Sequence, residues 1–230
     1  KKFKYPLIYP RIYESDKKEG IKVIQSGQIT MSKITKSFEK KFAKYVGSKY
    51  ALMVNSGSSA NLIATAACCN PLRKKKFKRG DEVLIPGICW STSLWPLIQN
   101  GLKPRFVDVN VKTLNIDIKD LKKKITKKTK AIIPVHFSGH PCNLDEIYAF
   151  SKKMKIKVIE DSAHAFGSMY KGKKIGSQGY INCFSFDGIK NITSSITRSV
   201  TSYHRNWLEM CESGFRYCQL WNIYTDTREG

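Results

Sequence analysis

The sequence predicts an α/β fold in which a mostly parallel central sheet is covered by helices on both faces, a three-layer α/β/α sandwich. Two observations carry this prediction: short apolar segments recur between residues 37 and 163, and helical segments join them. Apolar strands joined by helical crossovers form parallel sheets that are buried on both faces. A chain of 230 residues is long enough for one such domain with a buried core.

The first strand of the expected sheet lies between two helices. Residues 37–48 place aromatic side chains at helical spacing, with Ser37 as the candidate N-cap and Gly47 as the stop. The short apolar segment 50–54 is then a buried strand, and residues 58–69 form an apolar helix that is entered through a Gly-Ser turn.

The later segments repeat this unit of strand and helix. They are strand 82–86, helix 91–100 ended by Gly101, strand 105–109, strand 131–136, helix 144–154 and strand 157–163, followed by a last strand that leads into Lys190. Ligands of open parallel sheets bind beyond the carboxyl ends of the strands. The turns that follow these strands are therefore where we expect a functional site.

The last part of the chain differs in composition from the rest. All 33 lysines lie in residues 1–190, and the final 40 residues contain none. Residues 195–230 show no alternation of strand and helix, only a short helix around Trp207 to Cys211. We therefore expect a domain at residues 1–194, followed by an atypical tail that is disordered or lies beyond a disrupted reading frame.

Composition favours a cytoplasmic protein without a membrane partner. No apolar run approaches the roughly 18 residues that a membrane span needs, and the basic N-terminal segment lacks the apolar stretch of a secretion signal. The seven cysteines include no pair at metal-ligand spacing, so we expect reduced thiols and no metal site.

The net charge of +23 raises the question of nucleic-acid binding. Apart from the runs at 73–79 and 122–130 the lysines are scattered, and the two runs lack the repeated aromatic side chains that stack on bases. Solvated surface is therefore preferred over a specific nucleic-acid site. An anionic substrate is also compatible, because a positive field speeds encounters with phosphate esters.

A candidate phosphate cradle lies at NSGSSAN (55–61), where a strand ends in Gly57 and a helix begins at Ser58 or Ser59. A helix start offers free backbone N–H groups and the positive end of its dipole, and Gly57 allows close approach of an anion. A Ser-capped helix after a glycine turn is also common for structural reasons alone, so both interpretations stay open.

Acidic residues end the strand in KVIEDSAHAFG (157–167). A carboxylate such as Glu160 or Asp161 at the end of an apolar strand is costly to bury unless it meets a cation or several donors. The partner of Asp161 is either a protonated pyridine nitrogen or the N–H groups of a loop. His164, three residues on, is either a neighbour of a bound ring or a structural histidine.

A single lysine follows the last apolar strand, in INCFSFDGIKNITS (181–194). The amine of Lys190 is placed where burial could lower its pKa and allow a Schiff base with a carbonyl compound. Taken alone, this residue is one lysine of 33 and is better interpreted as an ordinary surface lysine.

Five motifs in this order resemble the DegT/DnrJ/EryC1/StrS family of sugar aminotransferases: NSGSSAN (55–61), PGICW (86–90), EDSAHAFG (160–167), KKIGSQG (173–179) and CFSFDGIKN (183–191). The resemblance runs from about Pro6 to Ser194 and covers most of the chain. It implies the large domain of a fold type I transferase that depends on pyridoxal 5'-phosphate (PLP), with the C-terminal small domain absent or disrupted.

The resemblance implies a role for three residues around the cofactor ring. Lys190 matches the lysine that binds PLP covalently and moves protons during catalysis. Asp161 matches the acid that pairs with the pyridine nitrogen and keeps it protonated. Trp90 matches the aromatic residue that stacks on the ring, although a position in the core stays open because Trp95 is near.

Further residues are implied to bind the rest of PLP. Ser58 and Ser59, which follow Gly57, match the pair that binds the phosphate, and Ser185 matches a further hydroxyl on the phosphate. His164 occupies the position of a Gln or His beside the ring oxygen of the cofactor.

The implied activity is transfer of an amino group, usually from glutamate, to the keto group of a nucleotide-linked sugar, for surface polysaccharide or amino-sugar biosynthesis. Relatives that remove a hydroxyl instead carry His in place of the lysine, so Lys190 favours transamination over dehydration. The family builds its site across a homodimer, which we expect for the full-length form. A truncated, non-catalytic remnant or a regulatory or binding subunit is the alternative, because the small domain is missing.

Overall fold

The computed structural model describes residues 13–27, 33–187, 189–190 and 199–203 of the chain. Its elements in chain order are α1 (Glu14–Gln25), α2 (Lys33–Val46), β1 (Tyr50–Val54), α3 (Gly57–Cys69), β2 (Glu82–Pro86), α4 (Ser91–Gln99), β3 (Lys103–Val107), α5 (Ile118–Lys124), β4 (Thr129–Ile132), the 3-10 turn η1 (Phe137–Gly139), α6 (Leu144–Met154), β5 (Lys157–Asp161), β6 (Met169–Tyr170), β7 (Lys173–Lys174), β8 (Ile181–Ser185) and β9 (Ser199–Tyr203).

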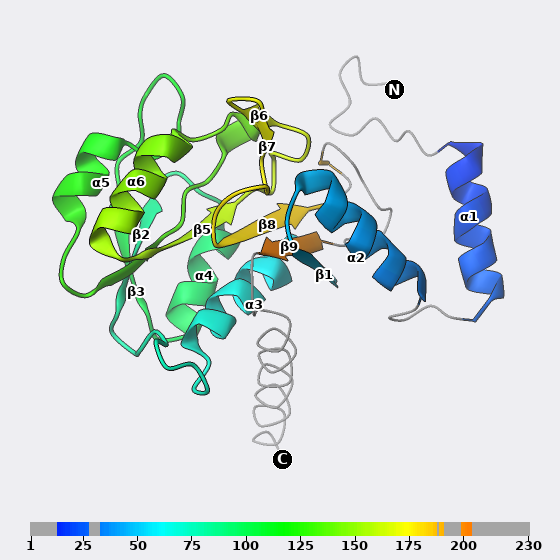
Figure 1. The fold of residues 1–230 in the computed structure, drawn as a ribbon, viewed down its shortest axis with the longest axis horizontal. Helices are drawn as coiled ribbons and strands as arrows, with labels where there is room; N and C mark the ends of the chain where they lie inside the picture. Colours follow the sequence, from blue (N-terminus) through cyan, green and yellow to red (C-terminus); the bar gives the residue numbers. More distant parts are fainter. Residues whose placement is uncertain (1–12, 28–32, 188, 191–198, 204–230) are drawn as a thin grey trace, which may run out of the picture.

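The described strands form a seven-stranded sheet in the order β1-β9-β8-β5-β4-β2-β3, and β6 and β7 form a separate small hairpin (Figure 1). Strands β8, β5, β4, β2 and β3 run parallel to one another, whereas β9 runs antiparallel to both of its neighbours, β1 and β8. The expected mostly parallel sheet is therefore confirmed, with β9 as its one antiparallel member among the described residues.

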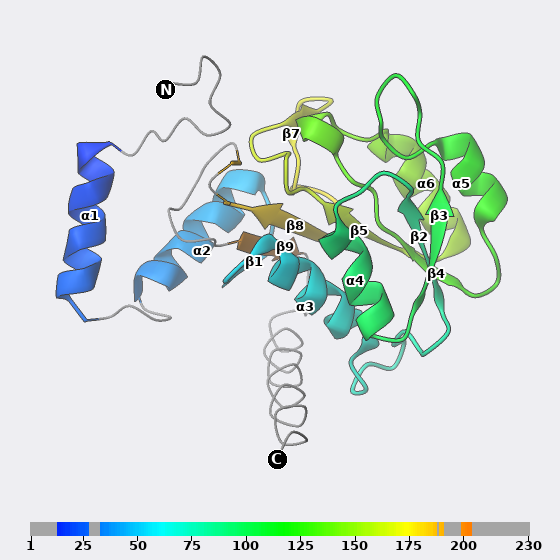
Figure 2. The same cartoon turned by 180° about the vertical axis from the view of Figure 1, so that it is seen from behind.

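Helices cover both faces of this sheet. Residues of α3 and α4 such as Ile63 and Leu97 pack with Val83 and Ile159 in one buried cluster. On the opposite face, α2, α5 and α6 pack against a second cluster that contains Phe184. Figures 1 and 2 show the two helical layers from opposite sides. This arrangement confirms the expected three-layer α/β/α sandwich.

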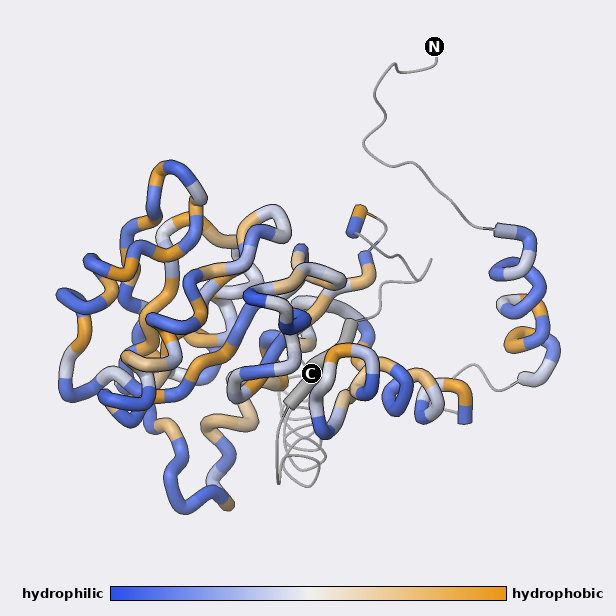
Figure 3. The backbone as a smooth tube through the Cα atoms, turned by 45° about the horizontal axis from the view of Figure 1, so that its top comes forward, coloured by the Kyte–Doolittle hydropathy of each residue, from blue (hydrophilic) through white to orange (hydrophobic). Residues whose placement is uncertain are grey.

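The local sequence explains why these segments form buried elements. All five residues of β8 are buried, as required of a strand covered on both faces. In contrast, α2 buries Phe42, Ala43 and Val46 and exposes lysines on its other side, the amphipathic pattern of an outer helix. In Figure 3 the outer helices accordingly alternate between hydrophilic and hydrophobic residues along their length.

Several expected boundaries differ from the structure. Helix α2 begins by Lys33, so the expectation that Ser37 is its N-cap is wrong, because the amphipathic pattern extends upstream of Ser37. Gly47 does end the helix, in a backbone conformation with φ of +83° that favours glycine. Strand β4 ends at Ile132 rather than near 136, before Pro134, which has no N–H for a ladder hydrogen bond.

One strand lies in the segment that we expected to be an atypical tail. Residues Ser199–Tyr203 form β9, which pairs with all five residues of both β1 and β8 and so joins the first strand to the rest of the sheet. The short helix expected around residues 207–211, like the rest of 204–230, lies outside the described residues. Within the described part of the chain, no helix is both long and apolar enough to cross a membrane.

Candidate active site

A cavity of about 360 Å³ lies at the carboxyl ends of the parallel strands. Its walls come from the turns that follow β1, β2, β4, β5 and β8. A volume of this size falls in the range of sites for small molecules and cofactors. The structure thus places a cavity at the edge of the sheet where the sequence predicts a functional site.

Most of the residues selected from the sequence lie around this one cavity. Those that line it are Gly57, Ser58, Trp90, Asp161, His164, Ser185 and Lys190. Ser59 does not line it: the Ser59 N–H donates to Ser56 Oγ at 3.1 Å, and the two hydroxyls are 3.0 Å apart. Seven residues from four separate segments of the sequence are therefore brought together by the fold.

The first turn of α3 forms one end of the cavity. Ser56 is the N-cap of this helix, in extended conformation, and its side chain satisfies the Ser59 N–H. Gly57 and Ser58 follow directly and face the cavity. The positive end of a 13-residue helix dipole and a serine hydroxyl are thus available to an anionic group such as a phosphate.

Asp161 provides a buried carboxylate on the cavity wall, with only 4% of the residue exposed. Its Oδ2 accepts hydrogen bonds from Ser93 Oγ at 2.6 Å and from Asn61 Nδ2 at 3.1 Å. Its Oδ1 accepts from the backbone N–H of Ala163 at 3.1 Å. These three donors satisfy a carboxylate that is buried away from water. Asp161 therefore has a loop N–H partner and also faces the cavity, as a partner for a cationic ring nitrogen must.

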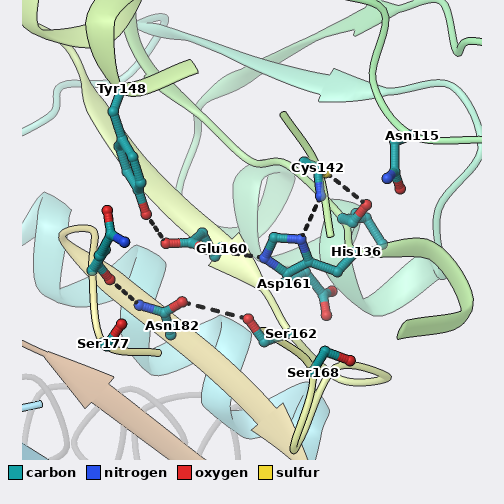
Figure 4. Close-up of polar contacts among 12 residues, drawn as sticks. Asn115, His136, Cys142, Tyr148, Glu160, Asp161, Ser162, Ser168, Ser177 and Asn182 are labelled. Atoms are coloured by element: carbon teal, nitrogen blue, oxygen red, sulfur yellow. Dashed lines mark hydrogen bonds and ion pairs between the residues drawn. The ribbon is translucent and has the colours of Figure 1, made fainter. Parts of the chain in front are cut away.

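The neighbouring acid, Glu160, belongs to the other face of the sheet. Its Oε2 lies 2.9 Å from His136 Nε2, and its Oε1 accepts a hydrogen bond from the hydroxyl of Tyr148 (Figure 4). None of these three side chains lines the cavity. Of the two acids at the end of β5, only Asp161 can contact a ligand in the cavity.

Trp90 is placed at the cavity mouth rather than in the core. Trp90 is 73% exposed and immediately precedes α4. The alternative of a core tryptophan is therefore excluded for this position, and Trp95 is also largely exposed at 53%. The ring of Trp90 is available to cover one face of a flat ligand.

His164, Lys190 and Asp161 are close enough to influence one another electrostatically. Burial lowers the pKa of His164, the positive charge of Lys190 lowers it further, and the negative charge of Asp161 acts in the opposite direction. Cys89 responds to the same acid, because burial raises the pKa of its thiol and the charge of Asp161 raises it again. The charges of Lys190 and Asp161 therefore both reach the imidazole of His164, and that of Asp161 also reaches the thiol of Cys89.

Sequence reasoning missed other residues of the site. Those lining the cavity include Asn61, Ile88, Cys89, Thr92, Val135 and Phe137. Asn61 belongs to the motif that we selected for its glycine and serines, whereas Val135 and Phe137 follow β4 without a distinctive motif. Ser93 was missed because its contact with Asp161 joins positions 68 residues apart.

The residues present fit the chemistry of PLP. A helix N-terminus with a serine suits the phosphate, a buried ionised carboxylate suits a protonated pyridine nitrogen, an exposed indole suits the ring face, and a lysine amine suits the aldehyde. Each of these groups lines the same cavity.

Comparison with known proteins gives consistent results. The sequence matches the DegT/DnrJ/EryC1/StrS aminotransferase family over residues 10–199. The GDP-4-keto-6-deoxy-D-mannose 3-dehydratase of Yersinia pseudotuberculosis is 46% identical over 164 residues. The E. coli GDP-4-keto-6-deoxy-D-mannose-3-dehydratase with bound hydrated PLP superposes with a TM-score of 0.82 at 38% identity. Helicobacter pylori PseC, an aminotransferase involved in the biosynthesis of pseudoaminic acid, superposes with a TM-score of 0.82 at 29% identity.

The chain spans about half the length of these relatives. The match covers 71% of this chain and 42% of the Yersinia dehydratase. It covers 86% of this chain and 51% of the E. coli structure, and 90% of this chain and 54% of PseC.

Proposed function

The chain belongs to the DegT/DnrJ/EryC1/StrS aminotransferase family, and we propose that it is the cofactor-binding part of an aminotransferase that acts on a nucleotide-linked keto sugar. The family, the fold type I architecture and PLP as the cofactor of the family are established by the comparisons. The amino donor that we propose is glutamate, and the pathway class is the biosynthesis of amino sugars or surface polysaccharides. The full-length form would act as a homodimer.

One observation carries the proposal: a lysine, a buried carboxylate and a helix N-terminus surround a single cavity at the carboxyl edge of the sheet. These three groups come from the turns after β8, β5 and β1. A surface lysine would have no reason to line a cavity opposite a buried acid. The placement of Lys190 therefore supports the role of cofactor lysine.

The bound cofactor would supply an electron sink for the electrons of the broken C–H bond. Asp161, held by three donors, would pair with the pyridine nitrogen and keep it protonated. Trp90 would cover the ring and exclude water from that face. The amine of Lys190 would hold the cofactor and then move a proton at its Nζ, for which the neutral form is required.

Dehydration of the sugar is the second candidate, favoured by the 46% identity to a GDP-sugar dehydratase. Dehydratases of the family carry His where this chain has Lys190. An imidazole can move a proton but cannot hold the cofactor as a primary amine does. The amine at position 190 is the feature that favours amino transfer.

Cofactor binding tests the proposal directly. PLP added to the full chain should give the visible absorbance of a lysine-bound cofactor, and borohydride reduction should leave a phosphopyridoxyl group on the peptide that contains Lys190. Lys190→Ala should lose the absorbance, whereas Lys112→Ala, at a residue outside the cavity lining, should keep it. A label on another lysine, or an unchanged spectrum in Lys190→Ala, would overturn the assignment.

Turnover separates the candidate reactions. With a GDP-linked 4-keto sugar and glutamate, amino transfer yields an amino sugar and 2-oxoglutarate, whereas dehydration consumes the sugar hydroxyl without leaving nitrogen on the product. PLP binding at Lys190 without any turnover would instead support a non-catalytic remnant or a binding subunit.

We propose residues 1–194 as the cofactor-binding domain; β9 (Ser199–Tyr203), which pairs with its sheet, follows just beyond this boundary. The nucleotide sequence around codon 194 tests the expectation for residues 195–230. A second reading frame that encodes a further strand and a small domain would support a disrupted frame, and its absence would remove that explanation.

A further inference from the structure

Two side chains from two different helices converge on one oxygen of Asp161. Ser93, in the first turn of α4, donates its hydroxyl proton to Oδ2 at 2.6 Å, and Asn61, in the first turns of α3, donates from Nδ2 to the same oxygen at 3.1 Å. Ser93 is 2% exposed, so no water competes for its hydroxyl. The opposite oxygen, Oδ1, accepts only the backbone N–H of Ala163 among the described residues.

The same two residues connect Asp161 to the turn that carries Trp90. The backbone N–H of Ser93 donates to Trp90 O at 2.9 Å, and Asn61 Nδ2 also donates to Thr92 O at 3.3 Å. The starts of α3 and α4 are therefore both tied to the carboxylate. The indole of Trp90 would contact the face of a bound ring, and the carboxylate of Asp161 would contact its edge. Ser93 and Asn61 connect these two groups through hydrogen bonds.

The two donors on Oδ2 leave no place for a proton on that oxygen. Asn61 Nδ2 carries two protons, and both are donated, one to Thr92 O and one to Oδ2. A proton on Oδ2 would meet this N–H with no acceptor available. Charge-assisted hydrogen bonds of the length seen for Ser93 are also stronger than neutral ones. With two donors on Oδ2, the remaining acceptor capacity of the carboxylate lies on Oδ1.

On this basis we propose that Ser93 and Asn61 are positioning residues for the cofactor. They occupy Oδ2 with two donors and fix the orientation of the Asp161 carboxylate, so that Oδ1 is the oxygen offered to the protonated pyridine nitrogen. The inference rests on the proposed function, because it concerns how this chain binds PLP. Neither residue contacts the reacting atoms itself, and each acts through Asp161.

Removing the Ser93 hydroxyl tests this role. In Ser93→Ala, the affinity for PLP should fall by about tenfold or more, the usual cost of losing a residue that orients a ligand-binding group. The pH midpoint of the bound-cofactor absorbance should also rise. A less firmly protonated ring nitrogen withdraws less charge from the nitrogen that joins Lys190 to PLP, so that nitrogen keeps its proton to higher pH.

Matched variants separate positioning from simple packing. Ser93→Thr keeps a hydroxyl and should restore both the affinity and the pH midpoint. Ser151→Ala removes another buried serine hydroxyl, which donates to Tyr148 O at 3.3 Å within α6, away from the cavity, and should change neither. Asn61→Ala removes the second donor from a half-buried position and should shift the pH midpoint in the same direction, even if Ser93→Ala does not fold.

The outcomes also separate this inference from the proposed function. If the unaltered chain binds no PLP at Lys190, both are overturned. The other outcome is that the chain binds PLP, but Ser93→Ala and Asn61→Ala keep the pH midpoint and lose thermal stability. The two residues would then only stabilise the packing of α3 and α4, and the inference alone would be wrong.

Discussion

Glu160 and Asp161 are consecutive residues of β5, and their carboxylates serve opposite faces of the sheet. Asp161 accepts hydrogen bonds from Ser93 on the face covered by α3 and α4. Glu160 is 1% exposed and meets His136 on the face covered by α6 (Figure 4). Because His136 Nδ1 accepts the backbone N–H of Cys142 at 3.0 Å, its proton is on Nε2 and is donated to Glu160. Because successive side chains of a strand point to opposite faces, Glu160 stabilises the fold on one face and Asp161 faces the cavity on the other.

Replacing Glu160 should therefore destabilise the fold. Glu160→Ala would leave the Nε2–H of His136 and the hydroxyl of Tyr148 buried without their acceptor, and we expect a loss of about 3–5 kcal/mol in the free energy of unfolding. Urea unfolding measures the loss. Glu19→Ala removes an exposed carboxylate that pairs with Lys22 at 2.6 Å and should cost less than about 1 kcal/mol. Equal losses in the two variants would contradict this account.

Gly179 approaches the same buried group. A Cβ at Gly179 would collide with Glu160 Oε1 and the Tyr148 hydroxyl, and the backbone there has φ of +87°. Gly172 has a similar φ of +77° but open space around it. Gly172→Ala should cost about 1 kcal/mol from the backbone alone, and Gly179→Ala about 2–3 kcal/mol more from the collision. Thermal unfolding of the two variants measures the difference. Similar midpoints would show that the side chains of Glu160 and Tyr148 move aside at little cost in free energy.

The fold was predictable where burial left a strong pattern. Strands such as β2 and β8 are covered on both faces, so their apolar runs identify them without any structural knowledge. Strand β9 was not predicted, although it pairs with β1 and β8 along its whole length. Its sequence, SVTSY, carries one aliphatic residue, and its place in the sheet depends on partners 14 or more residues away in the chain.

The candidate site was predictable only in part, for a related reason. Ser58 lies in the first turn of the helix that follows β1, and Asp161 is the last residue of β5, so the topology of the sheet brings both to its carboxyl edge. The contacts of Asp161 with Ser93 and Asn61 span 68 and 100 residues, and no local pattern signals them. The family resemblance implied roles for Ser58 and Asp161 but none for Ser93 and Asn61.

Alkylation of Cys89 should report on the charge of Asp161. Cys89 lines the cavity, and both burial and the negative charge of Asp161 raise its pKa, so little reactive thiolate is present near neutral pH. Its rate of reaction with iodoacetamide, followed by mass spectrometry of the peptide, should rise with pH over a range above the ordinary thiol value of about 8.5. Asp161→Asn removes the negative charge and should speed the reaction at a fixed pH. An unchanged rate in Asp161→Asn would show that the acid does not act on Cys89, and protection by PLP would place the thiol beside the bound cofactor.

His164 should make the protein less stable in mild acid. Burial and the charge of Lys190 lower its pKa in the folded state below the ordinary value of 6.5, so the unfolded chain binds more protons between the two values. Stability is therefore fully present above pH 6.5 and falls as the pH drops towards the lowered pKa. His164→Gln should remove this loss of stability, which is measured as the difference between the urea midpoints at about pH 7.5 and about pH 5.5. The control variant His140→Gln, which changes an exposed histidine, should retain the loss.

Lys190→Ala provides the complementary test, because removing its positive charge should raise the pKa of His164 in an NMR titration. A pKa that stays unchanged in Lys190→Ala would mean that the amine of Lys190 and the imidazole of His164 do not face each other across the cavity.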